Sequence, residues 1–118
     1  MQPPHIPELV KRKAEHLLAE YCRHRIDRLK CPHVVIDQCW DDTGVQLSCR
    51  DGCNPPWPIV RFQYASEFHQ WFLFSPAENG RWRPCLEVRS TLDFERLLFH
   101  LDRDPFRVFW PRSFTCFS

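Results

Sequence analysis

The chain has 118 residues, the usual size of one domain, and leaves no room for a second independent core. Its net charge is +1, so overall charge favours neither nucleic acid nor a membrane as partner. Aromatic residues make up 14% of the chain, and buried rings can supply a core at this size. No stretch resembles a membrane span or a signal peptide. We expect one cytoplasmic domain over residues 1–118, with tails at 1–6 and 111–118.

A long helix is predicted first, from about Pro7 to Lys30. It should end before Cys31-Pro32, because the residue preceding a proline disfavours the helical conformation. Its apolar residues recur at three- and four-residue spacing and form one stripe: Val10, Ala14, Leu17, Leu18, Tyr21 and Cys22.

Five strands are predicted next, over residues 33–40, 45–50, 57–65, 70–75 and 81–88, separated by Gly-, Pro-, Asn- and Asp-containing turns. A second helix, capped by Ser90 or Thr91, should extend to about Asp102. A short strand, Phe106 to Trp110, follows. The predicted fold class is α+β, with an antiparallel sheet that carries its helices on one face.

Alternation along the predicted strands sorts their side chains to two faces of the sheet. The apolar face, which we expect the helices to cover, collects Val34, Ile36, Val45, Leu47, Val60, Phe62, Tyr64, Trp71, Leu73, Trp82, Leu86 and Val88. The polar face carries four arginines: Arg50, Arg61, Arg81 and Arg83. Polar outer faces are usual for antiparallel sheets, but guanidinium groups also bind phosphates and stack on bases.

The seven cysteines are scattered and odd in number, which is typical of reduced thiols rather than of a disulfide framework. Cys49 and Cys53 bracket a turn, and Cys31 lies near His33. A structural zinc site usually needs two close pairs, and no clear second pair is present. We therefore assign no metal, no cofactor and no catalytic residue.

The best enzyme alternative is a metal-dependent nuclease or phosphodiesterase. The element order is loosely that of restriction-endonuclease-like folds, in which an acid precedes Glu-x-Lys on a strand. Asp41 or Asp42, followed by Glu87 and Arg89, matches this pattern only loosely, because Arg cannot tune its pKa as Lys can. A turn acid and a surface Glu–Arg pair are the structural alternative.

The last residues, Phe114 to Ser118, are apolar for a chain terminus. They either dock on the core of their own domain or contact a second copy. Both a monomer and a homodimer are therefore open alternatives, and a self-associating structural protein is another functional hypothesis.

Aromatic and arginine-containing segments extend through the second half: Pro58–Tyr64, Gln70–Phe74, Gly80–Trp82, Leu86–Val88, Asp104–Phe106 and Phe109–Trp110. Together with the first helix and Arg50, they resemble domain-of-unknown-function family 3024, from about Leu9 to Trp110. The chain is richer in Cys and Pro over 50–57 than this pattern, and its second helix is longer. The resemblance implies a small bacterial, cytoplasmic protein, and it transfers no catalytic residue.

The expected function is that of a small non-enzymatic binding module. Its partner would be nucleic acid or an acidic protein, bound by the polar sheet face through Arg50, Arg61, Arg81 and Arg83. No membrane partner is expected.

Overall fold

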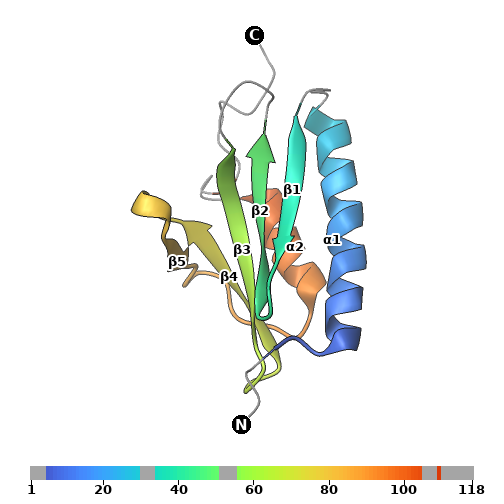
Figure 1. Ribbon diagram of the computed structural model, residues 1–118, viewed down its shortest axis with the longest axis vertical. Coiled ribbons are helices and arrows are strands. Elements are labelled where there is room, and N and C mark those ends of the chain that lie inside the picture. Colours follow the sequence, from blue (N-terminus) through green and yellow to red (C-terminus); the bar gives the residue numbers. More distant parts are fainter. Residues whose placement is uncertain (1–4, 30–33, 51–55, 105–108, 110–118) are drawn as a thin grey trace.

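The structure is a computed structural model that describes residues 5–29, 34–50, 56–104 and 109 (Figure 1). The elements are α1 Glu8–Leu29, β1 Val35–Trp40, β2 Gly44–Arg50, β3 Trp57–Ala65, β4 Gln70–Pro76, the 3-10 helix η1 Glu78–Gly80, β5 Trp82–Pro84 and α2 Phe94–Arg103. The predicted α+β class and the order helix, five strands, helix are confirmed. Of the predicted final strand, only Phe109 lies within the described residues.

The five strands form one antiparallel sheet in the order β1-β2-β3-β4-β5. Each strand pairs with its neighbour in the sequence, because connections of at most six residues join them. At the β1–β2 turn the Asp41 carboxylate accepts the backbone N–H groups of Thr43 and Gly44, both at 2.9 Å. This side chain therefore fixes the hairpin from which the rest of the sheet continues.

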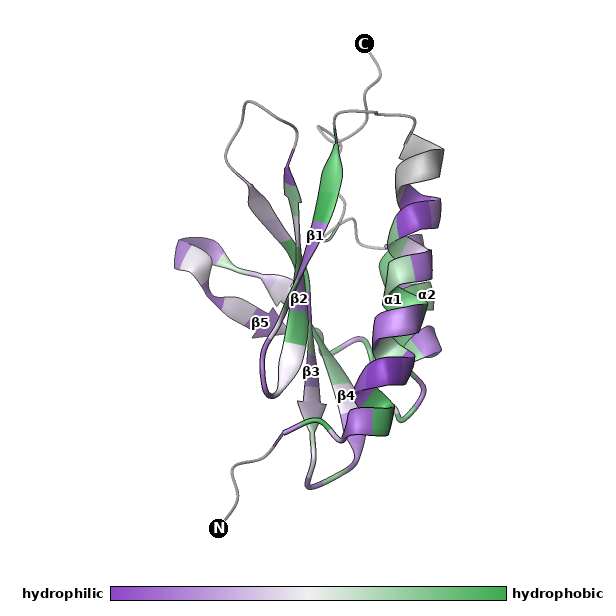
Figure 2. Ribbon diagram, turned by 45° about the vertical axis from the view of Figure 1, so that its right-hand side comes forward, coloured by the Kyte–Doolittle hydropathy of each residue, from purple (hydrophilic) through white to green (hydrophobic). Residues whose placement is uncertain are grey.

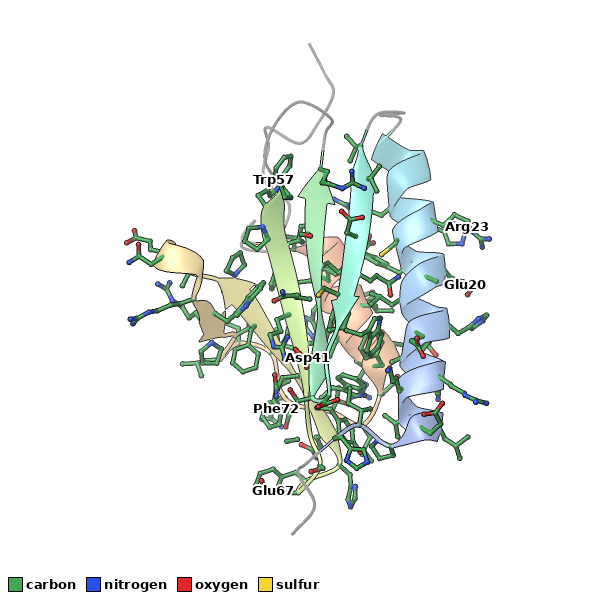
Figure 3. The ribbon with its side chains drawn as sticks, in the orientation of Figure 1. Glu20, Arg23, Asp41, Trp57, Glu67 and Phe72 are labelled. Atoms are coloured by element: carbon green, nitrogen blue, oxygen red, sulfur yellow. The ribbon has the colours of Figure 1, made fainter. Side chains whose placement is uncertain are left out.

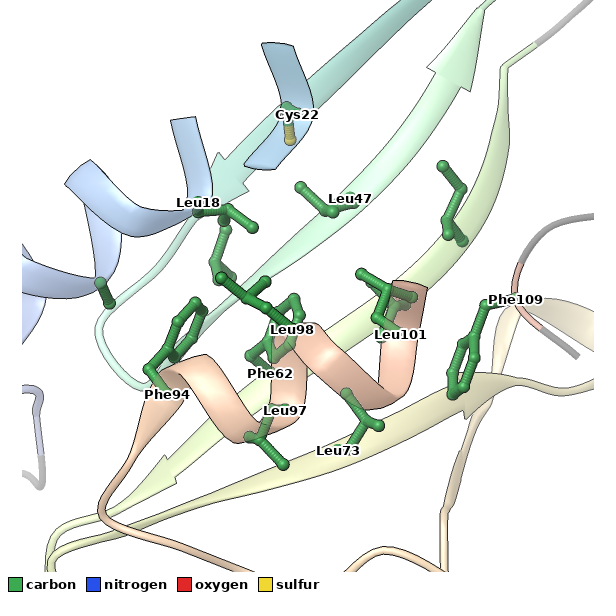
Figure 4. Close-up of a cluster of buried hydrophobic side chains, with 14 of the residues drawn as sticks. Leu18, Cys22, Leu47, Phe62, Leu73, Phe94, Leu97, Leu98, Leu101 and Phe109 are labelled. Atoms are coloured by element: carbon green, nitrogen blue, oxygen red, sulfur yellow. The ribbon is translucent and has the colours of Figure 1, made fainter. Parts of the chain in front are cut away.

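Both helices lie on the same side of the sheet (Figure 2). α1 buries Ala14, Leu18 and Cys22, which follow one another at four-residue spacing on one helix face. α2 buries the residues expected for an amphipathic helix: Phe94, Leu97, Leu98 and Leu101 (Figure 4). None of the helices in the described ranges is long and apolar enough to cross a membrane.

The core between α2 and the sheet is aromatic. Phe62 and Phe94 have ring centroids 4.8 Å apart, and Trp71 meets Phe94 edge-on at 4.9 Å. Tyr64 adds a further edge contact to Trp71 at 5.1 Å. Such tilted and edge-to-face pairs are favourable beyond their buried area. The alternating residues of β3 and β4 thus anchor α2 to one face of the sheet.

α2 begins later than predicted. Asp93 is its N-cap, and the Asp93 carboxylate accepts the backbone N–H of Glu95 at 3.0 Å. Thr91 instead forms an isolated bridge to Trp71 of β4 through two backbone hydrogen bonds. The bridge therefore removes Thr91, one of the two predicted caps, from that role.

β5 differs most from the prediction, because it covers only Trp82–Pro84. The connection from β4 contains Asn79 and Gly80, which both have positive φ, at 62° and 72°. It brings Trp82 opposite Pro76, and paired residues project to the same face. Trp82 therefore lies on the face away from the helices, so its predicted place on the apolar face was wrong.

Candidate binding face of the sheet

We use the term open face for the side of the sheet that α1 and α2 leave uncovered. The strand register places a row of side chains across it, from Cys39 through Gln46, Arg61 and Phe74 to Pro84. A second row pairs Gln63 with Phe72. The remaining open-face positions used below are Asp37, Ser48, Arg50, Pro76 and Trp82.

Half-buried aromatic rings occupy one side of the open face. Phe72 and Phe74 of β4 and Trp82 of β5 are all partly exposed. β4 reads Trp71-Phe72-Leu73-Phe74, so it is apolar at consecutive positions on both faces. A half-covered antiparallel strand normally alternates apolar and polar residues. The aromatic residues on the open face therefore depart from this alternation, and packing of the helices on the covered face does not require them.

Arg61 lies beside these rings, directly opposite Phe74 on the neighbouring strand. Its guanidinium donates through Nε to Gln63 Oε1 at 2.9 Å and contacts Asp41 Oδ2 through Nη2 at 3.0 Å. The Arg61 side chain is only 14% exposed, whereas that of Asp41 is 52% exposed. The guanidinium is thus held in place by Gln63 and by Asp41, both of which water still reaches.

The contact with Arg61 affects the protonation of Asp41. Burial pushes the pKa of Asp41 upward, but hydrogen bonds from Thr43 and Arg61 outweigh burial and leave the pKa below its usual value. The carboxylate therefore stays charged at neutral pH. Figure 3 shows Asp41 and Phe72 near the same end of the sheet.

Arg50 forms a second ion pair on the open face, at the β1–β2 side. Its Nε contacts Asp37 Oδ2 at 2.6 Å, and Nη2 donates to Oδ1 at 3.3 Å. The hydrogen bond from Arg50 lowers the pKa of Asp37. With side-chain exposures of 50% and 40%, the pair is accessible to solvent and to a competing anion.

The other two predicted arginines do not join this group. Arg83 pairs with Ser75, so its side chain projects to the side opposite Trp82 and Phe74. Arg81 lies in the connection before β5, where its carbonyl accepts the N–H of Ala77 at 2.8 Å. The structure brings Arg50 and Arg61 to one face, and the prediction of a four-arginine face was wrong. It also missed Phe72 and Phe74, although both stand in an unbroken apolar run.

The nuclease pattern is not assembled in the described ranges. Glu87 lies after the end of β5 at Pro84, so Glu87 and Arg89 are not on a strand before a helix as the pattern requires. Asp41 is engaged by its own hairpin and by Arg61. Among the described residues, no three His, Cys, Asp or Glu side chains gather where they could hold a metal ion.

Four cysteines lie in the described ranges, and all four are free thiols: Cys22, Cys39, Cys49 and Cys85. Burial raises the pKa of the Cys22 thiol to about 12 and also raises that of Cys85. These two thiols are therefore protonated at neutral pH and unsuited to nucleophilic attack. Cys31, His33 and Cys53 lie outside the described residues.

Comparison with known proteins gives a family without an assigned activity. A family model described as a domain of unknown function (DUF3024) matches residues 6–111, which is most of the chain. No curated protein and no solved structure shows significant similarity to the chain.

Proposed function

Because the chain belongs to the DUF3024 family, which has no assigned activity, we propose from its geometry that it binds single-stranded nucleic acid on the open face. The observation that carries the proposal is the set of three half-buried rings, Phe72, Phe74 and Trp82, on the uncovered side of an antiparallel sheet. Exposed aromatic rings on such a sheet provide stacking platforms for unpaired bases.

The spacing of the rings supports this reading. Phe72 and Phe74 are separated by one residue along β4, which corresponds to about 7 Å. Trp82 lies on the adjacent strand, opposite Pro76, and so extends the same apolar strip beyond Phe74. An extended single strand of nucleic acid can place successive bases on these rings. A duplex cannot, because its bases are already stacked on one another.

The polar neighbours supply the remaining contacts. Arg61 and Gln63 stand opposite Phe74 and Phe72. Their amide and guanidinium groups are donors for base edges or for phosphate oxygens. The solvent-exposed Asp37–Arg50 pair can open to a phosphate at little cost, since exposed ion pairs contribute little stability.

The charge balance sets the expected character of binding. Arg50 and Arg61 each face a carboxylate, and the net charge of the chain is +1. Stacking should therefore supply more of the affinity than phosphate contacts do. If two phosphates are engaged, log Kd should change with log salt by a slope of about 1.4, smaller than for a strongly basic protein.

The direct test is fluorescence anisotropy with a labelled single-stranded oligonucleotide, in both DNA and RNA forms, at several salt concentrations. Phe74→Ala should weaken binding about tenfold, since each stacked base contributes about 1–3 kcal/mol. Phe99→Ala is the matched control, because Phe99 is an exposed ring on α2, on the helix side of the sheet. It should leave the affinity unchanged.

A parallel pair of variants addresses the arginines. Arg50→Gln should reduce both the affinity and the salt slope, whereas Arg12→Gln should change neither. Arg12 is a fair match because it also forms an exposed ion pair, with Glu8 on α1. Absence of binding at low salt would refute the nucleic-acid proposal. Binding of an acidic peptide on the same face, without oligonucleotide binding, would assign the face to a protein partner instead.

A further inference from the structure

A polar hollow lies away from the open face, where the segment after β5 meets α2. Its volume is about 370 Å³, and the lining residues are Glu87, Arg89, Ser90, Thr91, Arg96, Leu97 and His100. The buried Leu97 contributes an apolar wall, and the other six lining side chains are all polar or charged. We propose that this hollow binds the phosphate group of a small phosphorylated molecule, independently of the open face.

The charge of the hollow comes from Arg89 and Arg96. Neither guanidinium has an ion pair or a side-chain hydrogen bond with another residue in the described ranges. This distinguishes them from Arg50 and Arg61, whose charges are already met by carboxylates. Two guanidinium groups that line one hollow from different segments are well suited to the oxygens of a phosphate.

The walls of the hollow are held by hydrogen bonds. The backbone groups of Thr91 form the bridge to Trp71, with N···O distances of 2.7 and 3.1 Å. Thr91 Oγ1 accepts the N–H of Asp93 at 3.0 Å, which leaves the hydroxyl proton of Thr91 free to donate. The bridge to β4 therefore fixes one donor beside the two guanidinium groups before any ligand arrives.

The size of the hollow and its one acidic lining residue, Glu87, indicate what kind of group carries the phosphate. Small-molecule sites occupy about 300–1,000 Å³, so this hollow has room for more than a bare phosphate ion. Glu87 would repel a ligand with several negative charges, but it can accept a hydrogen bond from a hydroxyl group. The geometry therefore favours a phosphomonoester that carries hydroxyl groups, such as a sugar phosphate.

Three acids bear on the expected affinity. Glu87 lines the hollow itself, and Asp93 and Glu95 line an adjoining hollow that shares Arg96 and His100. The guanidinium groups are also exposed to water. Binding should therefore be weak, with dissociation constants in the millimolar range, and should require a method suited to fast exchange.

The test is titration of the ¹⁵N-labelled full chain with ribose 5-phosphate, with ribose and inorganic phosphate as separate probes. Ribose 5-phosphate should give saturable amide shifts at Arg89–Thr91 and Arg96, and ribose should give none. Inorganic phosphate should shift the same amides at higher concentrations. An unsaturable response to ribose 5-phosphate would overturn the site, and equal affinity for inorganic phosphate would overturn the sugar-bearing ligand.

Variants distinguish binding in this hollow from a general effect of the protein's positive charge. Arg89→Gln combined with Arg96→Gln should weaken ribose 5-phosphate binding about tenfold or more, because charge-assisted hydrogen bonds are lost. Arg96→Lys retains the positive charge but not the paired N–H donors of the guanidinium group, so the loss of affinity should be intermediate. Arg23→Gln, an exposed position on α1, is the matched control. Equal losses in the control and the double variant would overturn the proposal.

Discussion

The two faces of the sheet use the same residue types in opposite ways. Trp71 and Phe62 are buried beneath α2, with exposures of 1% and 0%. Phe72 and Phe74 occupy alternate positions of the same region, and they remain partly exposed on the open face. The first pair serves folding, since burial of an aromatic ring removes a large apolar area from water. The second pair contributes less to folding, which leaves it available for binding.

The largest expected effect separates the two faces by stability. Trp71→Ala should lower the free energy of unfolding by about 3–5 kcal/mol, because it leaves a cavity in the core. Phe72→Ala should cost about 1 kcal/mol or less, since the ring is only partly buried. Urea denaturation followed by circular dichroism measures both. Similar losses for the two variants would show that the open-face ring also belongs to the core.

Gly44 offers a second way to test the sheet, at the start of β2. A Cβ atom at this position would lie 2.2 Å from the carbonyl oxygen of Phe62. Gly44→Ala should therefore force β2 and β3 apart and cost about 2 kcal/mol or more. Thermal unfolding measures the loss. The matched control is Gly80→Ala, where a Cβ meets no atom within 4 Å, although its φ of 72° adds some strain.

The covered face should also respond to the cap of α2. Asp93→Ala removes the side chain that accepts the Glu95 N–H, and it should cost about 1 kcal/mol. Asp93→Asn retains an acceptor oxygen and should recover most of that stability. Chemical denaturation of both variants gives the comparison. Equal losses in the two would mean that the cap is not the source of the effect.

The smallest effect is expected at the Asp37–Arg50 pair on the open face. The pKa of Asp37 is lowered in the folded chain by its hydrogen bond to Arg50, so its contribution to stability is full above the unfolded pKa of about 3.9. This contribution should be lost as pH falls through the folded pKa.

The measurement is the difference in unfolding free energy between the wild-type chain and Asp37→Asn, followed from pH 6 down to about pH 3. The difference should shrink toward the acid end. A difference that is constant with pH would contradict the ion pair, because a neutral hydrogen bond has no such dependence.

Much of the fold could be predicted because its signals are local. The four-residue spacing of Ala14, Leu18 and Cys22 and the prolines that bound the first helix are sufficient for α1. Alternation is sufficient for β2 and β3. The face of β5 could not be predicted, because it depends on the register set by the β4–β5 connection. That register places Trp82 opposite Pro76, and no local pattern encodes it.

The candidate site was predicted in part, for a related reason. Arg50 and Arg61 could be assigned to the polar face from the alternation of their own strands, and the structure places both there. Arg83 could not be assigned in this way, because the register of β5 turns its side chain to the face opposite the one that alternation predicted. Phe72 and Phe74 carried a readable signal, since an apolar residue at each position of a half-covered strand is unusual. Their exposure depends on which face the helices cover.

The central claim is that the open face, and not the helix side, binds single-stranded nucleic acid. The most direct measurement is a two-dimensional NMR titration of the labelled chain with an unlabelled single-stranded oligonucleotide at low salt. We predict saturable shifts at Phe72, Phe74, Trp82 and Arg61, with no change at Phe99 and the α1 surface. Shifts confined to the helix side, or no saturable shifts at all, would contradict the account.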